Sequence, residues 1–133
     1  MGKINVAIIG VGNCASSFVQ GIQKYREVPV DEFIPGLMHP MLGGYHIGDI
    51  NVVAAFDIDK TKVGKDLSEA SFAGQNNTAQ FSDVPHSGDT VDRGMTHDGL
   101  GKYLSEVIEK APGHSADIIV ILKEREVDVV INY

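Results

Sequence analysis

Short apolar runs alternate with amphipathic stretches along this chain, an order typical of proteins in which strands and helices follow one another. The first run, residues 6–9, has no polar alternation, so it predicts a strand that is buried on both faces. Runs at 50–56 and 127–133 have the same character. The pattern therefore predicts an α/β fold in which these three strands form a parallel sheet.

The stretches between the runs predict helices, because their apolar residues recur with helical spacing. The helices are expected at residues 14–25, 60–70, 98–110 and from 116 onward. Asp59 and Ser115 stand at the N-cap positions of the second and fourth helices. The apolar stripes of the first, third and fourth helices are Ala15, Val19 and Ile22; Leu100, Leu104, Val107 and Ile108; and Ile118, Ile121 and Leu122.

Two long segments, 28–49 and 72–97, have no regular pattern. Prolines and glycines are spread through the first segment, so no long helix or strand fits there. This segment is nevertheless too apolar to be disordered, and we expect its apolar side chains to pack on the rest of the protein. They are Phe33, Ile34, Leu37, Met38, Leu42, Tyr45 and Ile47. In the second segment, Val91 indicates a short strand.

A turn of small residues connects the first strand to the first helix. Gly10, Gly12 and Ala15 occupy the three small positions of the G-x-G-x-x-G/A pattern. Gly10 permits a tight turn, Gly12 leaves room for a pyrophosphate beside the backbone, and Ala15 lets the helix pack closely on the strand. The free N–H groups and the dipole of the helix N-terminus favour an anion. The motif predicts a dinucleotide site, although the same pattern also occurs in purely structural turns.

The second strand ends in acidic residues, Asp57 and Asp59. In Rossmann folds an acid at this point accepts hydrogen bonds from the adenosine ribose, which favours NAD over NADP. We assign that role to Asp57, and we attribute its distance from Gly12, which exceeds the usual spacing of roughly 20 residues, to the inserted segment 28–49. The expected fold is therefore a Rossmann-like doubly wound parallel sheet, incomplete, with its first three strands and long inserted loops.

Length and charge restrict the classes of function. The chain has 133 residues, enough for one domain, and its net charge of −7 disfavours nucleic acids and anionic membranes as partners. No apolar run reaches the roughly 20 residues of a membrane span, and the chain enters its first strand without a signal peptide. Cys14 is the one cysteine, so no internal disulfide can form. These features indicate a cytoplasmic protein.

Further catalytic chemistry is not evident in the sequence. The five histidines are scattered without the spacing of metal ligands, so we expect no metal site. Cys14 at a helix N-terminus can be read as a nucleophile or, more simply, as a small side chain that lines the phosphate turn. Lys65 and Lys102 lie among polar neighbours and are expected to be solvated. No residue is predicted to be catalytic.

Several motifs together are more specific than the glycine turn. They are GVGNCASS (10–17), PGLMH (35–39), LGGYHIGDI (42–50), AAFDID (54–59), KVGKDL (62–67), NNT (76–78), DVP (83–85), RGMTHDGLGKY (93–103) and the terminal VINY (130–133). In this combination the chain resembles the inositol-1-phosphate synthases, in the shorter form found in archaea and actinobacteria. The likeness covers nearly all 133 residues but only roughly the first third of such an enzyme.

The resemblance implies an NAD-dependent isomerase of inositol and phospholipid biosynthesis. Such an enzyme converts glucose 6-phosphate to 1L-myo-inositol 1-phosphate through oxidation, intramolecular aldol cyclisation and reduction with bound NAD. The residues that match its cofactor contacts are Gly10, Gly12, Asn13, Cys14, Ala15 and Asp57, with Asn132 and Tyr133 at the end of the third strand.

The resemblance also implies that residues 1–133 are the N-terminal NAD-binding Rossmann portion of the enzyme. The catalytic and tetramerisation domain would lie outside this chain, together with the lysines and acids that act on the sugar. The full-length enzyme is expected to be a homotetramer, and the 133-residue chain alone is expected to be inactive.

Two alternatives stay open on the sequence. An NAD-dependent sugar dehydrogenase would share the glycine turn, but that group has a short link after the first helix and a Lys-Pro pair near the third strand, which are missing here. A stand-alone module that senses NAD without catalysis would need only the dinucleotide site. Tight NAD binding by the chain alone would favour this second alternative.

Overall fold

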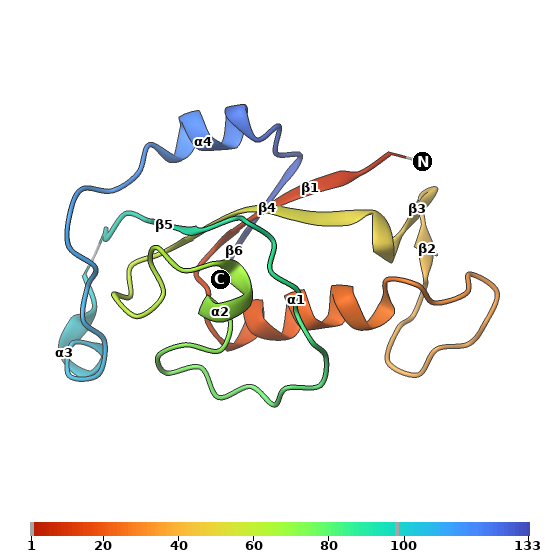
Figure 1. Ribbon diagram of the computed structural model, residues 1–133, viewed down its shortest axis with the longest axis horizontal. Helices are drawn as coiled ribbons and strands as arrows, with labels where there is room; N and C mark the ends of the chain where they lie inside the picture. The colour runs from red at the N-terminus through yellow and green to blue at the C-terminus, as the bar shows by residue number, and fades with distance from the viewer. Residues whose placement is uncertain (1, 98) are drawn as a thin grey trace.

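The computed structural model describes residues 2–97 and 99–133, in which a parallel sheet lies between two layers of helices (Figure 1). The strands of the sheet are β1 (Ile4–Ile9), β4 (Ile50–Asp57), β5 (Val91–Arg93) and β6 (Val129–Asn132). The helices are α1 (Asn13–Tyr25), α2 (Leu67–Ala70), α3 (Gly101–Leu104) and α4 (Ile118–Glu124). A hairpin of β2 (Met41–Leu42) and β3 (Tyr45–His46) precedes the 3-10 turn η1 (Ile47–Asp49).

The strand order is β5-β4-β1-β6, and all three pairings are parallel. The predicted parallel α/β sheet is thereby confirmed: the three predicted strands form, and the short strand indicated at Val91 joins them as β5, so the described residues supply four strands. The short β5 at Val91 is the third strand, and β6 is the fourth, on the other side of β1. Because the direction of winding reverses beside β1, the sheet has the switch point at which ligands bind in open α/β folds.

The two faces of the sheet are covered by different helices, as expected for a doubly wound fold (Figure 1). Alternate side chains of β1 point to opposite faces, so that Val6 and Ile8 pack with residues of α1 and α2, whereas Ala7 packs on the side of α4. The face toward α1 holds the larger buried cluster, which includes Ala15 and Val19. The predicted apolar face of the first helix is therefore confirmed.

β6 is an edge strand rather than a buried one. Val129 and Val130 are 46% and 43% exposed, because β1 pairs with only one side of this strand. An apolar run predicts a strand but does not reveal whether a further strand lies beside it. The expectation that residues 127–133 are buried on both faces is thus wrong for the described residues.

The predicted helix at 60–70 shortens to α2, and Asp66, not Asp59, is its N-cap. Residues 64 and 65 pair with β5 instead: Gly64 N–H donates to Val91 O, and Val91 N–H donates to Lys65 O. Asp59 Oδ1 instead accepts hydrogen bonds from the backbone N–H and the hydroxyl of Thr61. A tertiary pairing has replaced the local helix.

The predicted helix at 98–110 is also shorter and is limited to α3; Asp98 lies outside the described residues. Its expected last turn is extended, because Lys60 N–H donates to Glu109 O and Ala111 N–H donates to Ile58 O. The helix after Ser115 forms as α4, but Asp117 caps it, since the Ser115 hydroxyl accepts a hydrogen bond from Arg93.

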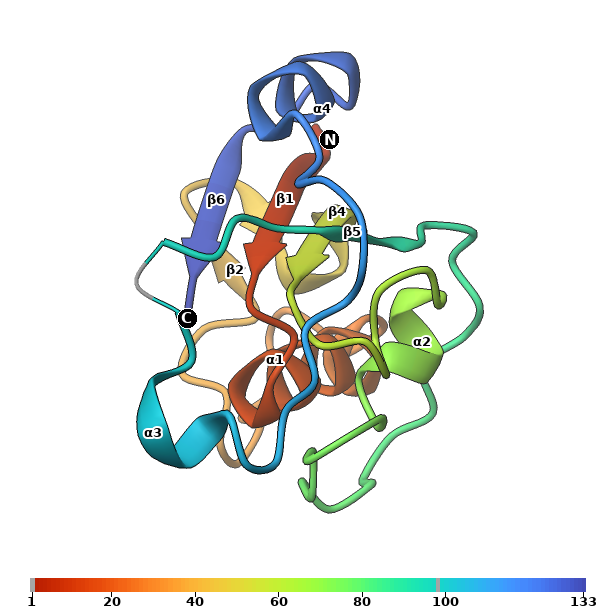
Figure 2. The same ribbon diagram turned by 90° about the vertical axis from the view of Figure 1, so that its left-hand side faces the viewer.

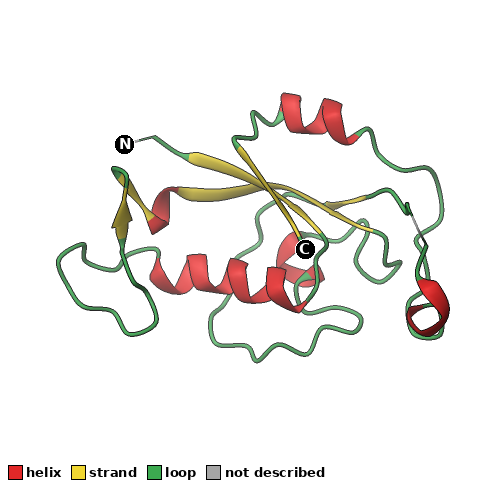
Figure 3. Ribbon diagram, turned by 180° about the vertical axis from the view of Figure 1, so that it is seen from behind, coloured by secondary structure: helices red, strands yellow, loops and turns green. Residues whose placement is uncertain are grey.

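Residues 28–40 and 72–90, the irregular parts of the two long segments, are loops on the side of the sheet that α1 covers (green in Figure 3). The first segment closes into the β2–β3 hairpin beyond the end of α1. Phe33 and Met38 are 89% and 88% exposed, and Leu42 and Tyr45 are also exposed, so the expectation of packing is wrong for these four side chains. The other three, Ile34, Leu37 and Ile47, are half-buried. Two-residue strands pair with each other through backbone hydrogen bonds and bury little apolar surface.

None of the helices formed by the described residues is long and apolar enough to cross a membrane.

Candidate functional site

The glycine turn lies at the carboxyl edge of the sheet, toward which the arrows of β1, β4 and β6 point in Figure 2. Gly10 directly follows β1 with a φ of +93°, and its N–H donates to Phe56 O at 2.8 Å. A Cβ at this position would also lie 3.4 Å from Tyr133 O. Gly10 thus serves the tight turn that the motif predicts, because a side chain here would be strained.

Gly12 is the N-cap residue of α1, with φ −91° and ψ −160°. Apart from the adjacent residues of its own chain segment, no atom of the described residues lies within 4 Å of the position that a Cβ at Gly12 would occupy, and Gly12 lines a cavity, so the space beside it is open. Ala15 is fully buried between α1 and the sheet, which allows the close packing that was predicted. The backbone of the turn is therefore accessible at Gly12, while Ala15 packs closely against the sheet.

The N-terminus of α1 has unused hydrogen-bond donors. Gly12 offers no side chain to cap it, and the first turn contains no acidic residue. Ser16 N–H makes the first bond of the helix, to Gly12 O, whereas the N–H groups of Asn13, Cys14 and Ala15 have no acceptor among the described residues. Together with the helix dipole, these N–H groups favour an anion in front of Gly12.

Asp57 ends β4 beside the turn and is already hydrogen-bonded to the backbone. Its Oδ2 accepts Val11 N–H at 2.7 Å, and its Oδ1 accepts the N–H groups of Ile58 and Asp59 at 2.7 and 2.9 Å. A carboxylate offers about four acceptor positions, so one remains, on Oδ2. Asp57 thus shapes the glycine turn and can still accept one hydroxyl group.

The side chain of Asn13 faces the segment 76–78 rather than the open space in front of the helix. Its Oδ1 accepts the N–H groups of Asn77 and Thr78 at 2.8 and 3.1 Å. In turn, Asn76 Nδ2 donates to Val11 O at 3.0 Å. The second long segment is therefore attached to the glycine turn, a contact that sequence reasoning missed because these residues lie far apart in the chain.

Cys14 and Tyr133 lie on the other side of the turn. Cys14 is exposed, and Tyr133 N–H donates to Ile9 O at 3.0 Å, which places the backbone and Cβ of Tyr133 beside Gly10. Partial burial raises the pKa of the Tyr133 phenol, and the thiolate form of Cys14 adds to the rise. Asn132 is exposed on β6 and pairs with Ile9.

One cavity of about 470 Å³ brings most of the predicted site residues together. This volume lies within the range of roughly 300–1,000 Å³ that is typical of small-molecule sites. The predicted residues that line it are Gly10, Gly12, Asn13, Cys14, Asp57 and Tyr133. Two predicted residues do not line it: Ala15, which is buried behind the turn, and Asn132.

Further residues of this cavity were missed as site residues. Leu100, Leu104 and Ile108 form an apolar wall of the cavity. Their helical spacing in the sequence predicted an apolar helix face, which was expected to pack against the core and not to line a site. Lys62 also lines the cavity. In the sequence it stood out only as part of the KVGKDL motif, because its burial depends on the tertiary structure.

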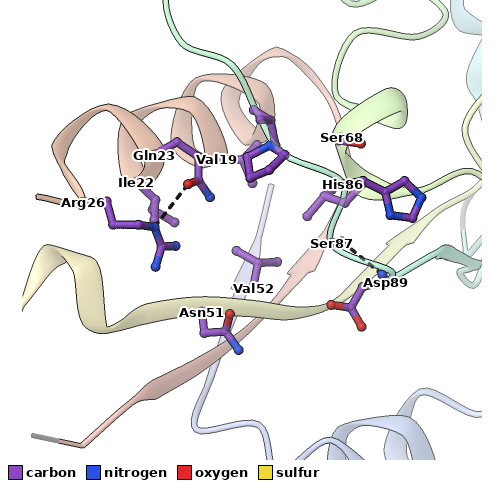
Figure 4. A pocket seen from close by; sticks show the side chains of 13 residues that line it. Val19, Ile22, Gln23, Arg26, Asn51, Val52, Ser68, His86, Ser87 and Asp89 are labelled. Carbon is purple, nitrogen blue, oxygen red and sulfur yellow. Dashed lines mark hydrogen bonds between the residues drawn. The ribbon is translucent and has the colours of Figure 1, made fainter.

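A second cavity, of about 450 Å³, lies between α1, β4 and the segment 84–89 (Figure 4). Its charged side chains already have protein partners. Arg26 donates to Gln23 Oε1 and to Gly48 O, and Asp89 forms an ion pair with Arg125. None of the predicted site residues lines this cavity, so the glycine turn remains the candidate site. The described residues hold no cluster of three or more His, Cys, Asp or Glu side chains that could bind a metal.

Sequence comparison relates the chain to named enzymes. It is 54% identical over 132 residues to the inositol-3-phosphate synthase of Mycolicibacterium smegmatis and 47% identical over 130 residues to that of Corynebacterium glutamicum. The matches cover 99% and 98% of this chain but 36% of each relative. The chain thus spans about a third of the length of these relatives. No family model matches it.

Two solved structures have the same fold over 98% of the chain. The crystal structure of Ari2 aligns with a TM-score of 0.76 at 29% identity, and this chain covers 37% of it. A myo-inositol-1-phosphate synthase-related protein from Thermotoga maritima aligns with a TM-score of 0.68 at 28% identity, with 34% of that protein covered.

Proposed function

Because the chain belongs, over the stretch that it covers, to the inositol-3-phosphate synthase family, we propose that it is the NAD-binding portion of such an enzyme. The whole enzyme would convert glucose 6-phosphate to 1L-myo-inositol 1-phosphate by oxidation, intramolecular aldol cyclisation and reduction. Bound NAD would supply the hydride acceptor for the first step and the hydride donor for the last. The names of the relatives favour this reaction over that of a sugar dehydrogenase.

The open space in front of Gly12 is the observation that carries this proposal. A diphosphate placed there would meet the free N–H groups of Asn13, Cys14 and Ala15 at the positive end of the α1 dipole. The residues present therefore fit a dinucleotide. Their role in this chain is to bind and orient the cofactor.

Asp57 would orient the adenosine end of the cofactor. The acceptor position that is left on Oδ2 suits a ribose hydroxyl, whereas the 2′-phosphate of NADP would meet the negative charge of the carboxylate. We therefore expect NAD to bind more tightly than NADP. Asp57→Asn should reduce this preference, since it removes the charge, although its amide nitrogen can no longer accept the backbone N–H group that one carboxylate oxygen accepts.

Two glycine variants of α1 test the site. Gly12→Ala adds a Cβ in open space at an ordinary φ, so we expect a loss of stability below about 1 kcal/mol. The methyl group would nevertheless occupy the path of the diphosphate, and calorimetric titration should show NAD affinity reduced at least about tenfold.

Gly21→Ala is the matched control, because it also adds a Cβ where no atom lies within 4 Å, but within α1 and away from the turn. It should leave NAD binding unchanged. Equal affinities of the Gly12→Ala and Gly21→Ala variants, or no saturable NAD binding by the unmodified chain, would contradict the proposal.

A further inference from the structure

Lys62 is a buried cation in the wall of the candidate site. The residue is 5% exposed and lines the same cavity as Gly12, Asp57 and Tyr133. Its Nζ donates to Asn76 Oδ1 at 3.0 Å. An ammonium group has three N–H donors, so this neutral amide uses one of them.

No carboxylate among the described residues lies within 4.0 Å of Lys62 Nζ, whereas its neighbour Lys60 forms an ion pair with Glu109. Asp59, the acid on the same turn, uses Oδ1 to accept hydrogen bonds from Thr61. Lysine is almost never buried unless it is paired, because desolvation of the charge is costly. Within the described part of the chain, Lys62 thus has no carboxylate within ion-pair distance, although the buried Asp59 carboxylate lies nearby in the wall of the same cavity.

The cavity has two sources of positive potential, the N-terminus of α1 and the Lys62 ammonium group, beside the two carboxylates of Asp57 and Asp59 that also line it. They come from different elements, one after β1 and one after β4. Asn76 connects them, since its Oδ1 accepts from Lys62 while its Nδ2 donates to Val11 O in the glycine turn. Lys62 is held beside the backbone that would carry the diphosphate.

We propose that Lys62 is a phosphate-binding residue of this site and donates a charge-assisted hydrogen bond to the diphosphate of the bound dinucleotide. The inference rests on the proposed function and adds to it a side chain that the glycine motif does not include. The alternative is a purely structural role, in which the Lys62 side chain would only hold Asn76 in place. A structural role would affect every ligand, whereas a phosphate contact affects only phosphorylated ones.

Titrations of the full chain with NAD, ADP and adenosine distinguish the two roles. Lys62→Met should lower the affinities for NAD and ADP on the order of tenfold or more and leave that for adenosine unchanged. Lys62→Arg keeps the charge and should restore NAD and ADP binding. Lys62→Gln removes the charge but keeps a donor for Asn76, so it provides the same test if the methionine variant does not fold.

Lys65→Met is the matched control, because Lys65 carries the same charge on the same turn but is exposed and does not line the cavity. All three affinities should stay at the level of the unmodified chain. Unchanged NAD and ADP binding by the Lys62 variants, or an equal loss for adenosine, would overturn the Lys62 assignment alone. If the unmodified chain binds neither NAD nor ADP, the proposed function is overturned, and the inference with it.

Discussion

The two long irregular segments of this protein, residues 28–49 and 72–97, look alike in the sequence but are held in very different ways. The first closes on itself through the β2–β3 hairpin and leaves Phe33 and Met38 in solvent. The second is attached at several points to polar side chains outside the segment, of which Gln20 and Asp66 are buried and Asn13 is exposed. Both segments have few regular hydrogen bonds of their own.

Gln20, Asp66 and Asn13 are three of the side chains that attach the second segment. Gln20 on α1 accepts the N–H groups of Phe81 and Ser82 through Oε1, and Asp66 accepts the N–H group of Gly88. Asn13 accepts the N–H group of Asn77. These bonds satisfy backbone groups that a loop cannot pair by itself. The loop that lies at the candidate site is thus the one that the core holds in place.

In the first segment, the main side-chain anchor is His46. Its Nδ1 accepts Gly48 N–H at 2.9 Å, which makes Nε2 the protonated nitrogen that donates to Val28 O at 3.0 Å. Both partners belong to the same segment, so this histidine closes the loop without attaching it to the sheet. The comparison teaches that irregular chain becomes fixed through buried polar anchors rather than through its apolar content.

The largest effect is expected from Gln20→Ala. Gln20 is fully buried, and its loss would leave the N–H groups of Phe81 and Ser82 without an acceptor and open a small void. We expect a loss of about 3 kcal/mol in the free energy of unfolding, measured by urea titration. Gln23→Ala on the same helix, where the side chain accepts only from Arg26, should cost much less. Equal losses would show that Gln20 is not an anchor.

Asp66→Asn is expected to cost about 2 kcal/mol near neutral pH. Burial of Asp66 opposes its ionisation, but hydrogen bonds from the Ser68 hydroxyl and from the N–H groups of Ser68, Gly88 and Ser87 outweigh it and lower the pKa to about 2. A carboxyl with a lower pKa in the folded state stabilises the protein above the unfolded pKa of about 3.9. This stabilisation is lost as the pH falls from about 4 toward 2.

The difference in stability between the unmodified chain and Asp66→Asn should therefore shrink over that acidic range, as thermal melts at a series of pH values would show. Asp31→Asn, at an exposed position of the first segment, is the control and should change little at any pH. A difference that does not depend on pH would contradict the assigned role of the charge.

His46→Ala should cost about 1 kcal/mol, because two hydrogen bonds of a half-buried group are lost. Since both bonds lie within the first segment, faster hydrogen exchange is expected at Gly48 and not in β1 or β4. The exposed His39 offers a control substitution in the same loop. Faster exchange throughout the sheet would mean that the first segment is coupled to the core after all.

The smallest effect is expected from Phe33→Ser. At 89% exposure, the ring contributes almost no buried area, so the free energy of unfolding should change by no more than about 0.5 kcal/mol. Phe56→Ala in the fully buried part of β4 should instead cost about 3–5 kcal/mol in the same urea titration. A large effect of Phe33→Ser would show that the first segment packs in solution.

Sequence reasoning was most successful where the physical cause is local. Residues 6–9 and 50–56 predicted strands that form, and the helical spacing of Ala15, Val19 and Ile22 predicted the buried face of α1. Gly10 and Gly12 have the backbone geometry that their motif predicts. It failed at residues 60–70 and 98–110, whose apolar spacing fits a helix while their backbone pairs with distant segments.

The candidate site divides in the same way. The sequence alone determined the glycine turn and the acid beside it. The small residues set the backbone of the turn locally, and Asp57 stands directly at the end of a strand that the sequence predicts. Only the tertiary structure decided that β6 lies beside β1, that residues 100–108 supply an apolar wall and that Lys62 is buried within reach of the turn. Those outcomes depend on which distant segments come together, and hydrophobic periodicity carries no information about such pairings.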